Sequence, residues 1–183
     1  MIKKTAFTII FSSLLMGHSL ALTDITAAHR EDNAVANAEE IIEMRSRLAK
    51  TIDSSSEITE ETFKRVCGAV ARRAQEISAG EGVKIRHATL KNRNKMTAAT
   101  PEEEALIRLF EDKKKKEHWD NVTIDGAAHR RYTRPIYVEK ACLACHGEKE
   151  ARPRFIKDKY PDDKAYGYKE GELRGIISIL LPE

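Results

Sequence analysis

The sequence places two cysteines and a histidine together at Cys142, Cys145 and His146, in the segment ACLACHG. Cys-x-x-Cys-His is the attachment signature of a c-type haem. The spacing lets two thiols form thioether bonds with the two vinyl groups of one porphyrin, while the adjacent imidazole becomes the proximal ligand of the iron. Because the motif occurs once, the sequence predicts one covalent haem c.

Two other interpretations of these cysteines have less support. A redox Cys-x-x-Cys pair of the thioredoxin type expects a surrounding βαβ pattern, which the sequence lacks. A structural zinc site needs four ligands. The chain has only three cysteines, with no second Cys-x-x-Cys or His-x-x-x-His pair.

The function of a haem protein depends on the other axial position of the iron. A second strong ligand there favours electron transfer, whereas an open position favours binding of small molecules. The residue types that could ligate there are Cys67, His87, Met96, His118 and His129. His118 lies beside a lysine run and Met96 lies in a loop. His87 falls on the apolar side of a predicted strand, as a core histidine would. His129 follows a predicted hairpin turn and is the best of the histidines.

Cys67 differs from these candidates because it lies within an apolar helical stripe, next to Gly68. A lone helical cysteine is usually a small buried hydrophobe. In an exported protein, however, a leftover thiol would be oxidised, whereas a thiolate bound to ferric iron is protected and its charge is compensated. We therefore predict Cys67 as the distal ligand, with His129 as the alternative.

The N-terminal segment predicts export. Lys3 and Lys4 precede an apolar run from Thr5 to Met16, and Ser19-Leu20-Ala21 supplies the pattern that signal peptidase reads. The run is shorter than the roughly 20 residues of a membrane span. We expect residues 1–21 to be a signal peptide and the mature protein to be periplasmic or otherwise exported, without a transmembrane anchor. The alternative is that this segment is an uncleaved membrane anchor or a buried helix.

The charge balance argues against two classes of partner. The chain has 32 Lys and Arg against 29 Asp and Glu. Without Lys3 and Lys4 the count is 30 against 29, so the mature protein is nearly neutral. This balance favours neither nucleic acid nor an anionic membrane as a partner.

The elements that must position these residues follow from periodicity. Apolar residues at helical spacing predict helices over 37–48 and 63–77, the second ended by Gly80 and Gly82. Alternation predicts a strand over 83–87, and Thr100 with Glu103 predicts a capping box that opens a short helix. Asp125-Gly126 indicates a hairpin with a loop longer than two residues. Pro135 indicates that the second strand of this hairpin lies at an edge or contains a bulge. The apolar β-branched run 175–181 predicts a final strand. Helices followed by strands predict a single α+β domain with an antiparallel sheet.

Several segments in combination resemble the exported c-type haem domains that have a PAS-like, sensor-kinase-type fold. They are VCGAVA, RHATLKNRNKMTAATPEEEALIRLFE, YTRPIYVEKACLACHG and YPDDKAYGYKEGELRG. The resemblance covers residues 57–183, which leaves 22–56 as an N-terminal helical segment. It implies helices packed on a PAS-like antiparallel sheet, with His146 and Cys67 as the axial ligands. It implies no established catalytic reaction.

Three functions are compatible with these observations. A redox- or gas-sensing module would release Cys67 on reduction and pass its signal to a separate partner protein of unknown identity. A low-potential electron carrier would dock a redox partner, with the Lys113 to Lys116 run as a candidate surface. A haem enzyme such as a peroxidase would need an open distal site and an acid–base residue. Arg86 and Arg93 are candidates to pair with the haem propionates, although surface arginines are usually exposed.

Overall fold

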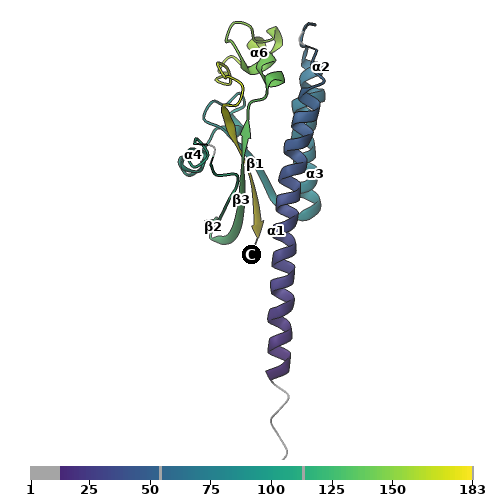
Figure 1. Ribbon diagram of the computed structural model, residues 1–183, viewed down its shortest axis with the longest axis vertical. Coiled ribbons are helices and arrows are strands. Elements are labelled where there is room, and N and C mark those ends of the chain that lie inside the picture. Colours follow the sequence, from purple (N-terminus) through teal and green to yellow (C-terminus); the bar gives the residue numbers. More distant parts are fainter. Residues whose placement is uncertain (1–12, 54, 113, 183) are drawn as a thin grey trace, which may run out of the picture.

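A long helix forms one side of the molecule. The computed structural model describes residues 13–53, 55–112 and 114–182, with side chains from residue 26 onward. Helix α1 (Ser13–Ala49) is far longer than the predicted helix over 37–48. Its buried apolar residues are small or β-branched, and they recur at helical spacing at Ala34, Ala38, Ile41 and Ala49. The part of α1 before these residues extends beyond the rest of the molecule (Figure 1).

The second predicted helix is interrupted at its start. It comprises α2 (Glu60–Phe63), a π-helical turn η1 (Lys64–Gly68) and α3 (Ala69–Glu81). The apolar stripe is confirmed, because Val66, Val70, Ala74 and Ile77 are all buried. Gly82 ends the helix in the left-handed conformation, at φ 66°.

Four antiparallel strands form the sheet, in the order β1-β4-β3-β2. Their bounds are β1 Lys84–Ala88, β2 His118–Ile124, β3 Ala127–Tyr137 and β4 Leu173–Pro182. The predicted α+β class with an antiparallel sheet is therefore confirmed.

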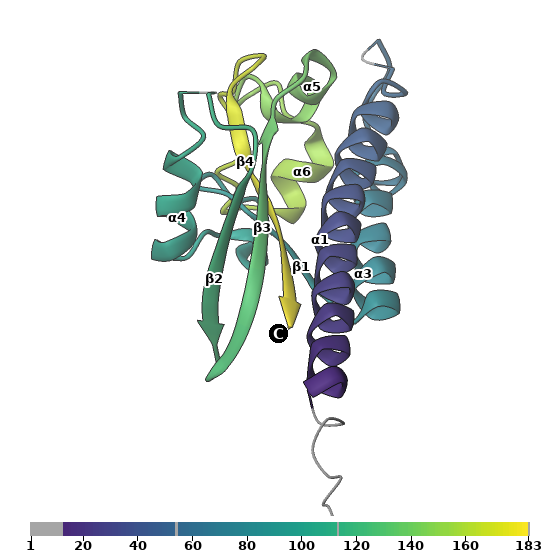
Figure 2. The same cartoon turned by 60° about the horizontal axis from the view of Figure 1, so that its bottom comes forward.

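Strand β4 joins the two sides of the core. Ile177 and Ile179 pack with the residues of α1 and α3, whereas Ile176 packs with Leu106 and Ile107 of helix α4 (Pro101–Arg108). Successive side chains of a strand point to opposite faces, so α1 and α3 cover one face of the sheet and α4 covers the other. Figure 2 shows the sheet between these two layers.

The β2–β3 hairpin corrects one expectation. Ile124 pairs with Ala127, so the turn is the two-residue form made by Asp125 and Gly126, with φ 53° and 80°. The expected longer loop is wrong because Ala127 to Arg130, which lack apolar alternation, still pair with β2. The expectation for Pro135 is confirmed. It lies beyond the last β2 pair, at Thr133, and just before an irregularity at Ile136/Tyr137.

Helix α4 has the predicted capping box of Thr100 and Glu103, with Pro101 at its first position. It ends at Arg108, before the lysine run. The chain turns away after Leu109, which leaves Lys114 to Lys116 exposed in the connection to β2.

The two ends of the sheet differ and are named here by what they carry. The hairpin end holds the β2–β3 turn. At the opposite, cavity end, β3 leads into η3 (Lys140–Cys142) and α5 (Leu143–His146), followed by α6 (Arg154–Lys159) and the start of β4. The short helix η2 (Lys95–Thr97) follows β1.

The predicted signal peptide lies largely outside the described residues. Residues 1–12 are not described, and the expected cleavage point after Ala21 falls within α1, where only the backbone is described. Among the residues that the structure describes, none of the helices is both long enough and apolar enough to span a bilayer.

Candidate haem site

Cys67, Cys142, Cys145 and His146 all line one cavity of about 360 Å³ at the cavity end. These residues come from segments more than seventy positions apart in the sequence. The π-helical turn η1 supplies Cys67, whereas η3 and α5 supply the others. The structure thus brings together the four residues predicted to bind the haem.

Cys67 reaches the cavity from the π-helical turn. A π turn inserts one extra residue into a helix, and such turns occur frequently at functional sites. Val66 on this turn is buried, whereas Cys67 and Gly68 are half-buried and line the cavity. The thiol is free, as are those of Cys142 and Cys145.

The Cys-x-x-Cys-His motif forms a short helical turn. Cys142 N–H donates to the carbonyl of Glu139 at 2.9 Å, and Gly147 N–H donates to that of Leu143 at 2.8 Å. Residues three apart on a helix share a face, so Cys142 and Cys145 lie side by side on the cavity wall. Burial raises the pKa of both thiols, that of Cys145 to about 11. They are therefore protonated at neutral pH.

The imidazole of His146 is held by a backbone carbonyl. Its Nδ1 lies 2.7 Å from the carbonyl oxygen of Ala165. A carbonyl can only accept, so Nδ1 carries the proton and Nε2 keeps the lone pair that binds metals. Burial, followed by the charges of Arg174 and Arg93, lowers the pKa of His146 well below its usual range. The ring is neutral and its tautomer is that of a metal ligand.

A buried ion cluster fixes the segments on either side of this bond. Asp163 is fully buried and accepts hydrogen bonds from Arg93 at 3.3 Å and Arg152 at 2.8 Å. It also accepts one from Ala165 N–H at 2.9 Å. Arg93 in turn donates to the carbonyl of Cys145 at 2.7 Å. The cluster therefore positions both the Ala165 carbonyl and the His146 backbone, as outer partners of a metal ligand do.

The other candidates for the distal position are distributed widely. His87 lines the cavity, and its buried Nε2 has no hydrogen-bond partner. Burial and the charges of Arg45 and Arg174 lower its pKa to about 3, so it is neutral. His129, the predicted alternative, lies instead at the hairpin end and bonds to the carbonyl of Ala127 at 3.0 Å.

The cavity lining includes neither His118 nor Met96, and the Met96 side chain is 75% exposed. Of the two arginines predicted to meet propionates, Arg93 lines the cavity. Arg86 does not, and it pairs with Glu103 instead.

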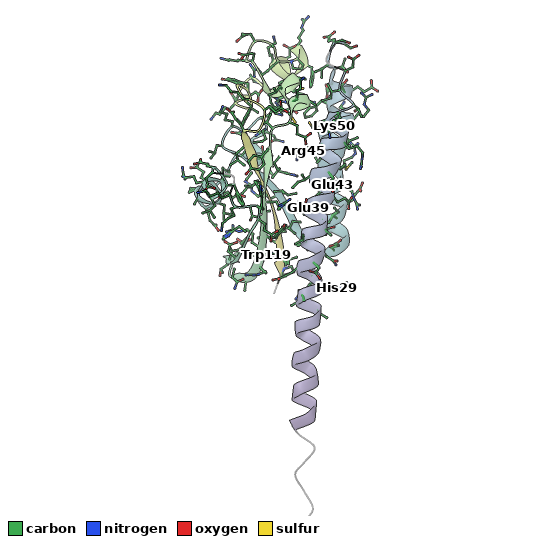
Figure 3. All side chains as sticks on the ribbon, viewed as in Figure 1. His29, Glu39, Glu43, Arg45, Lys50 and Trp119 are labelled. Carbon is green, nitrogen blue, oxygen red and sulfur yellow. The ribbon has the colours of Figure 1, made fainter. Side chains whose placement is uncertain are left out.

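The sequence-based prediction missed two charged residues of the cavity lining, Arg45 and Arg174. Arg45 carries a signal that could have revealed it. It lies four residues after buried Ile41 and four before buried Ala49, so a charged side chain occupies the inner face of α1. Figure 3 shows Arg45 on the side of α1 that faces the sheet.

The comparisons with known proteins concern almost the whole chain. A family model described as Tll0287-like matches residues 26–182. The chain is similar to the crystal structure of the cyanobacterial heme-protein Tll0287, at 35% sequence identity and a TM-score of 0.75. That match covers 85% of this chain and 96% of the cyanobacterial chain. No curated protein matches the chain.

Proposed function

The chain belongs to the Tll0287-like family, and on this basis we propose that it is an exported c-type haem protein with one covalent haem. Cys142 and Cys145 form the thioethers and His146 is the proximal ligand. Cys67 is the distal ligand. Its structural relative Tll0287 is a heme-protein, which supports haem binding by this chain.

The observation that carries the proposal is the convergence of these four side chains on one cavity. The residues fit a haem in three respects. The two thiols share a helical face, the His146 tautomer leaves Nε2 available, and the wall supplies positive charge through Arg45 and Arg174. Cavity volumes of about 300–1,000 Å³ are typical of cofactor sites.

The haem, when bound, supplies a one-electron couple, and the protein sets the potential of that couple through its ligands. A thiolate from Cys67 would favour the ferric state and lower the reduction potential. Its position on a π-helical turn would give the backbone a place to adjust if the bond were exchanged. Low-potential electron transfer and redox or gas sensing are therefore the two roles proposed, each requiring a partner protein.

Covalent attachment is tested on the purified holoprotein. Extraction with acidified acetone should leave the haem with the polypeptide, and the pyridine haemochrome spectrum should be that of a haem with two thioethers. Cys142→Ala should give a spectrum with one remaining vinyl group. Haem that is fully extracted from the wild-type protein would contradict the thioether assignment.

Axial ligation is tested with Cys67→Ala and the control His129→Ala. We expect the ferric absorption and EPR spectra to change in Cys67→Ala and to be preserved in His129→Ala, because only Cys67 lines the cavity. Unchanged spectra in Cys67→Ala would exclude thiolate ligation. The reduced wild-type protein then separates the two roles, since binding of CO or NO favours gas sensing and its absence favours electron transfer.

A peroxidase-type enzyme is the second candidate, and the observation in its favour is the neutral His87 imidazole on the cavity wall. Its Nε2 has no hydrogen-bond partner among the described residues and would be the proton acceptor, and the low pKa makes it a weak one. Turnover of peroxide by the wild-type holoprotein, lost in His87→Ala, would support this function. Axial ligation by Cys67 would contradict it because the distal site would be closed.

A further inference from the structure

Two of the arginines that line the cavity have no carboxylate partner. Within the described part of the chain, Arg45 makes no hydrogen bond or ion pair, and its Nε is buried. Arg174 donates through Nη1 to Thr89 Oγ1 at 2.6 Å, the Lys91 carbonyl at 3.1 Å and Tyr168 Oη at 3.4 Å. These three acceptors are uncharged. Neither guanidinium meets a carboxylate among the residues that the structure describes.

Other arginines of this region are neutralised. Arg93, on the same wall, pairs with Asp163 at 3.3 Å, and Arg86 pairs with Glu103 at 2.5 Å. An exposed arginine needs no carboxylate, but a desolvated one without a partner costs several kcal/mol. Because the nearby cations are paired, the lack of a partner for Arg45 and Arg174 indicates that their anion comes from outside the chain.

The two unpaired cations belong to one electrostatic environment. Burial lowers the pKa of both guanidinium groups, and the charge of Arg45 further lowers the pKa of Arg174. Both charges also act on His87, which is neutral and offers no compensation. The wall of the cavity therefore presents two neighbouring positive charges.

We propose that Arg45 and Arg174 bind the two propionate groups of the haem, an inference that rests on the proposed function. Two guanidinium groups match two carboxylates in number, and arginine binds carboxylate through a planar pair of donors. The remaining charges also balance. A ferric porphyrin core carries one positive charge, which a Cys67 thiolate would offset.

The thiolate itself is the other anion that Arg45 could serve. Arg45 lies close enough to Cys67 and Cys142 for both thiols to affect its pKa. In the described residues, however, no hydrogen bond joins Arg45 to the Cys67 sulfur. A thiolate would also leave Arg174 without a partner, whereas the propionates account for both arginines.

The test compares ferric haem with ferric haem dimethyl ester, which has the same iron and ring but no propionate charge. The full-length chain with Cys142→Ser and Cys145→Ser is used so that both porphyrins bind reversibly. We expect this chain to bind haem at least about 100-fold more tightly than the ester, because two charge-assisted contacts are lost in the ester. Adding Arg45→Gln or Arg174→Gln should each reduce this preference by about 10-fold.

Arg86→Gln is the matched control, because it removes a nearby arginine that does not line the cavity. Its preference for haem should equal that of the parent chain. Equal affinity of the parent for haem and ester would overturn the arginine assignment while leaving haem binding intact. If neither porphyrin bound, the proposed function would fail instead.

Resonance Raman spectroscopy of the covalently loaded holoprotein provides a second measurement. The propionate bending band should shift in Arg45→Gln and in Arg174→Gln but not in Arg86→Gln. If Arg45→Gln instead altered only the iron–thiolate EPR signal, Arg45 would be a partner of Cys67 and the assignment of this residue would be wrong.

Discussion

At the hairpin end of the sheet, Arg131 is buried and bonds to Asp120 and Glu102, both from the chain itself. At the cavity end, Arg45 and Arg174 are half-buried, and none of the described residues offers either of them such a carboxylate. Arginine therefore has a structural role at the hairpin end, whereas at the cavity end the guanidinium groups of Arg45 and Arg174 have donors from which no carboxylate of the described residues accepts. The difference locates the region where a negatively charged group from outside the chain is needed.

The backbone conformation also differs between the hairpin end and the cavity end. The hairpin end uses a regular two-residue turn and uninterrupted pairing between β2 and β3. The cavity end contains the π-helical turn, the irregularity in β3 after Pro135 and the close approach of Gly175 to β1. The irregular backbone conformations therefore lie at the end of the sheet that holds the candidate ligands. Changes at the cavity end should thus affect haem properties as well as stability, whereas changes at the hairpin end should affect stability alone.

The largest effect is expected for Asp163→Asn. The change leaves Arg93 and Arg152, whose side chains are 7% and 9% exposed, without their common carboxylate. Breaking a buried ion cluster in this way costs about 3–5 kcal/mol of unfolding free energy. We also expect less covalent haem per chain, measured by pyridine haemochrome, because Asp163 positions the segment that binds His146.

Asp162→Asn is the control for this change, since Asp162 is 76% exposed. It should leave both stability and haem content unchanged. Equal stability of the two variants in urea would show that the cluster contributes nothing.

The same carboxylate predicts a pH dependence. Burial raises the pKa of Asp163, but the hydrogen bonds from Arg152 and Ala165 and the charge of Arg93 outweigh it, so the folded pKa lies below that of an unfolded aspartate. The stabilisation is therefore complete above the unfolded pKa and is lost as pH falls through the lower folded pKa. Acid unfolding curves of Asp163→Asn should lack this contribution.

A smaller effect, about 1–3 kcal/mol, is expected for Gly175→Ala. A Cβ at Gly175 would lie 2.3 Å from the carbonyl oxygen of Ala88, so β4 would have to move away from β1. Because Gly175 lines the cavity, the absorption spectrum should shift as well. Gly80→Ala is the control, with nothing within 4 Å of the new methyl group. If the spectrum of Gly175→Ala were identical to that of the wild type, the contact between β4 and β1 would have no influence on the haem site.

Asp120→Asn sharpens the comparison at the hairpin end. Arg131 would lose one carboxylate but keep Glu102, at 2.8 Å. We therefore expect a loss of about 1–2 kcal/mol in the free energy of unfolding and an unchanged haem spectrum. A change in the spectrum would mean that the two ends are coupled.

The smallest effect is expected for Gly126→Ala, at the tip of the hairpin. Gly126 adopts φ 80°, which costs alanine about 1 kcal/mol. Open space surrounds the position, so the loss should come from the backbone alone. Thermal unfolding measures it, and the reduction potential of the holoprotein should equal that of the wild type. An altered potential would contradict the separation of the two ends.

Much of the fold could be predicted from local pattern. The apolar spacing around Val70 and Ile77, the capping box at Thr100 and the final strand are all local signals, and all three appear in the structure. The length of α1 and the two-residue turn were missed. Both involve segments with weak apolar periodicity. Ala127 to Arg130 are held by pairing with β2, whereas the first part of α1 extends beyond the rest of the molecule (Figure 1).

The chemistry that is available to this protein can be inferred from local spacing alone. Cys142, Cys145 and His146 carry their signal in their order along the chain, because one helical turn is enough to align two thiols with an imidazole. What these residues meet depends on the folded chain. Cys67 and Arg45 come from other helices. The segments that pack around Arg45 place no hydrogen-bond partner at its buried Nε, which its local sequence does not reveal. The reason is physical: spacing along the chain fixes local geometry, whereas desolvation and charge compensation depend on every segment that packs around a group.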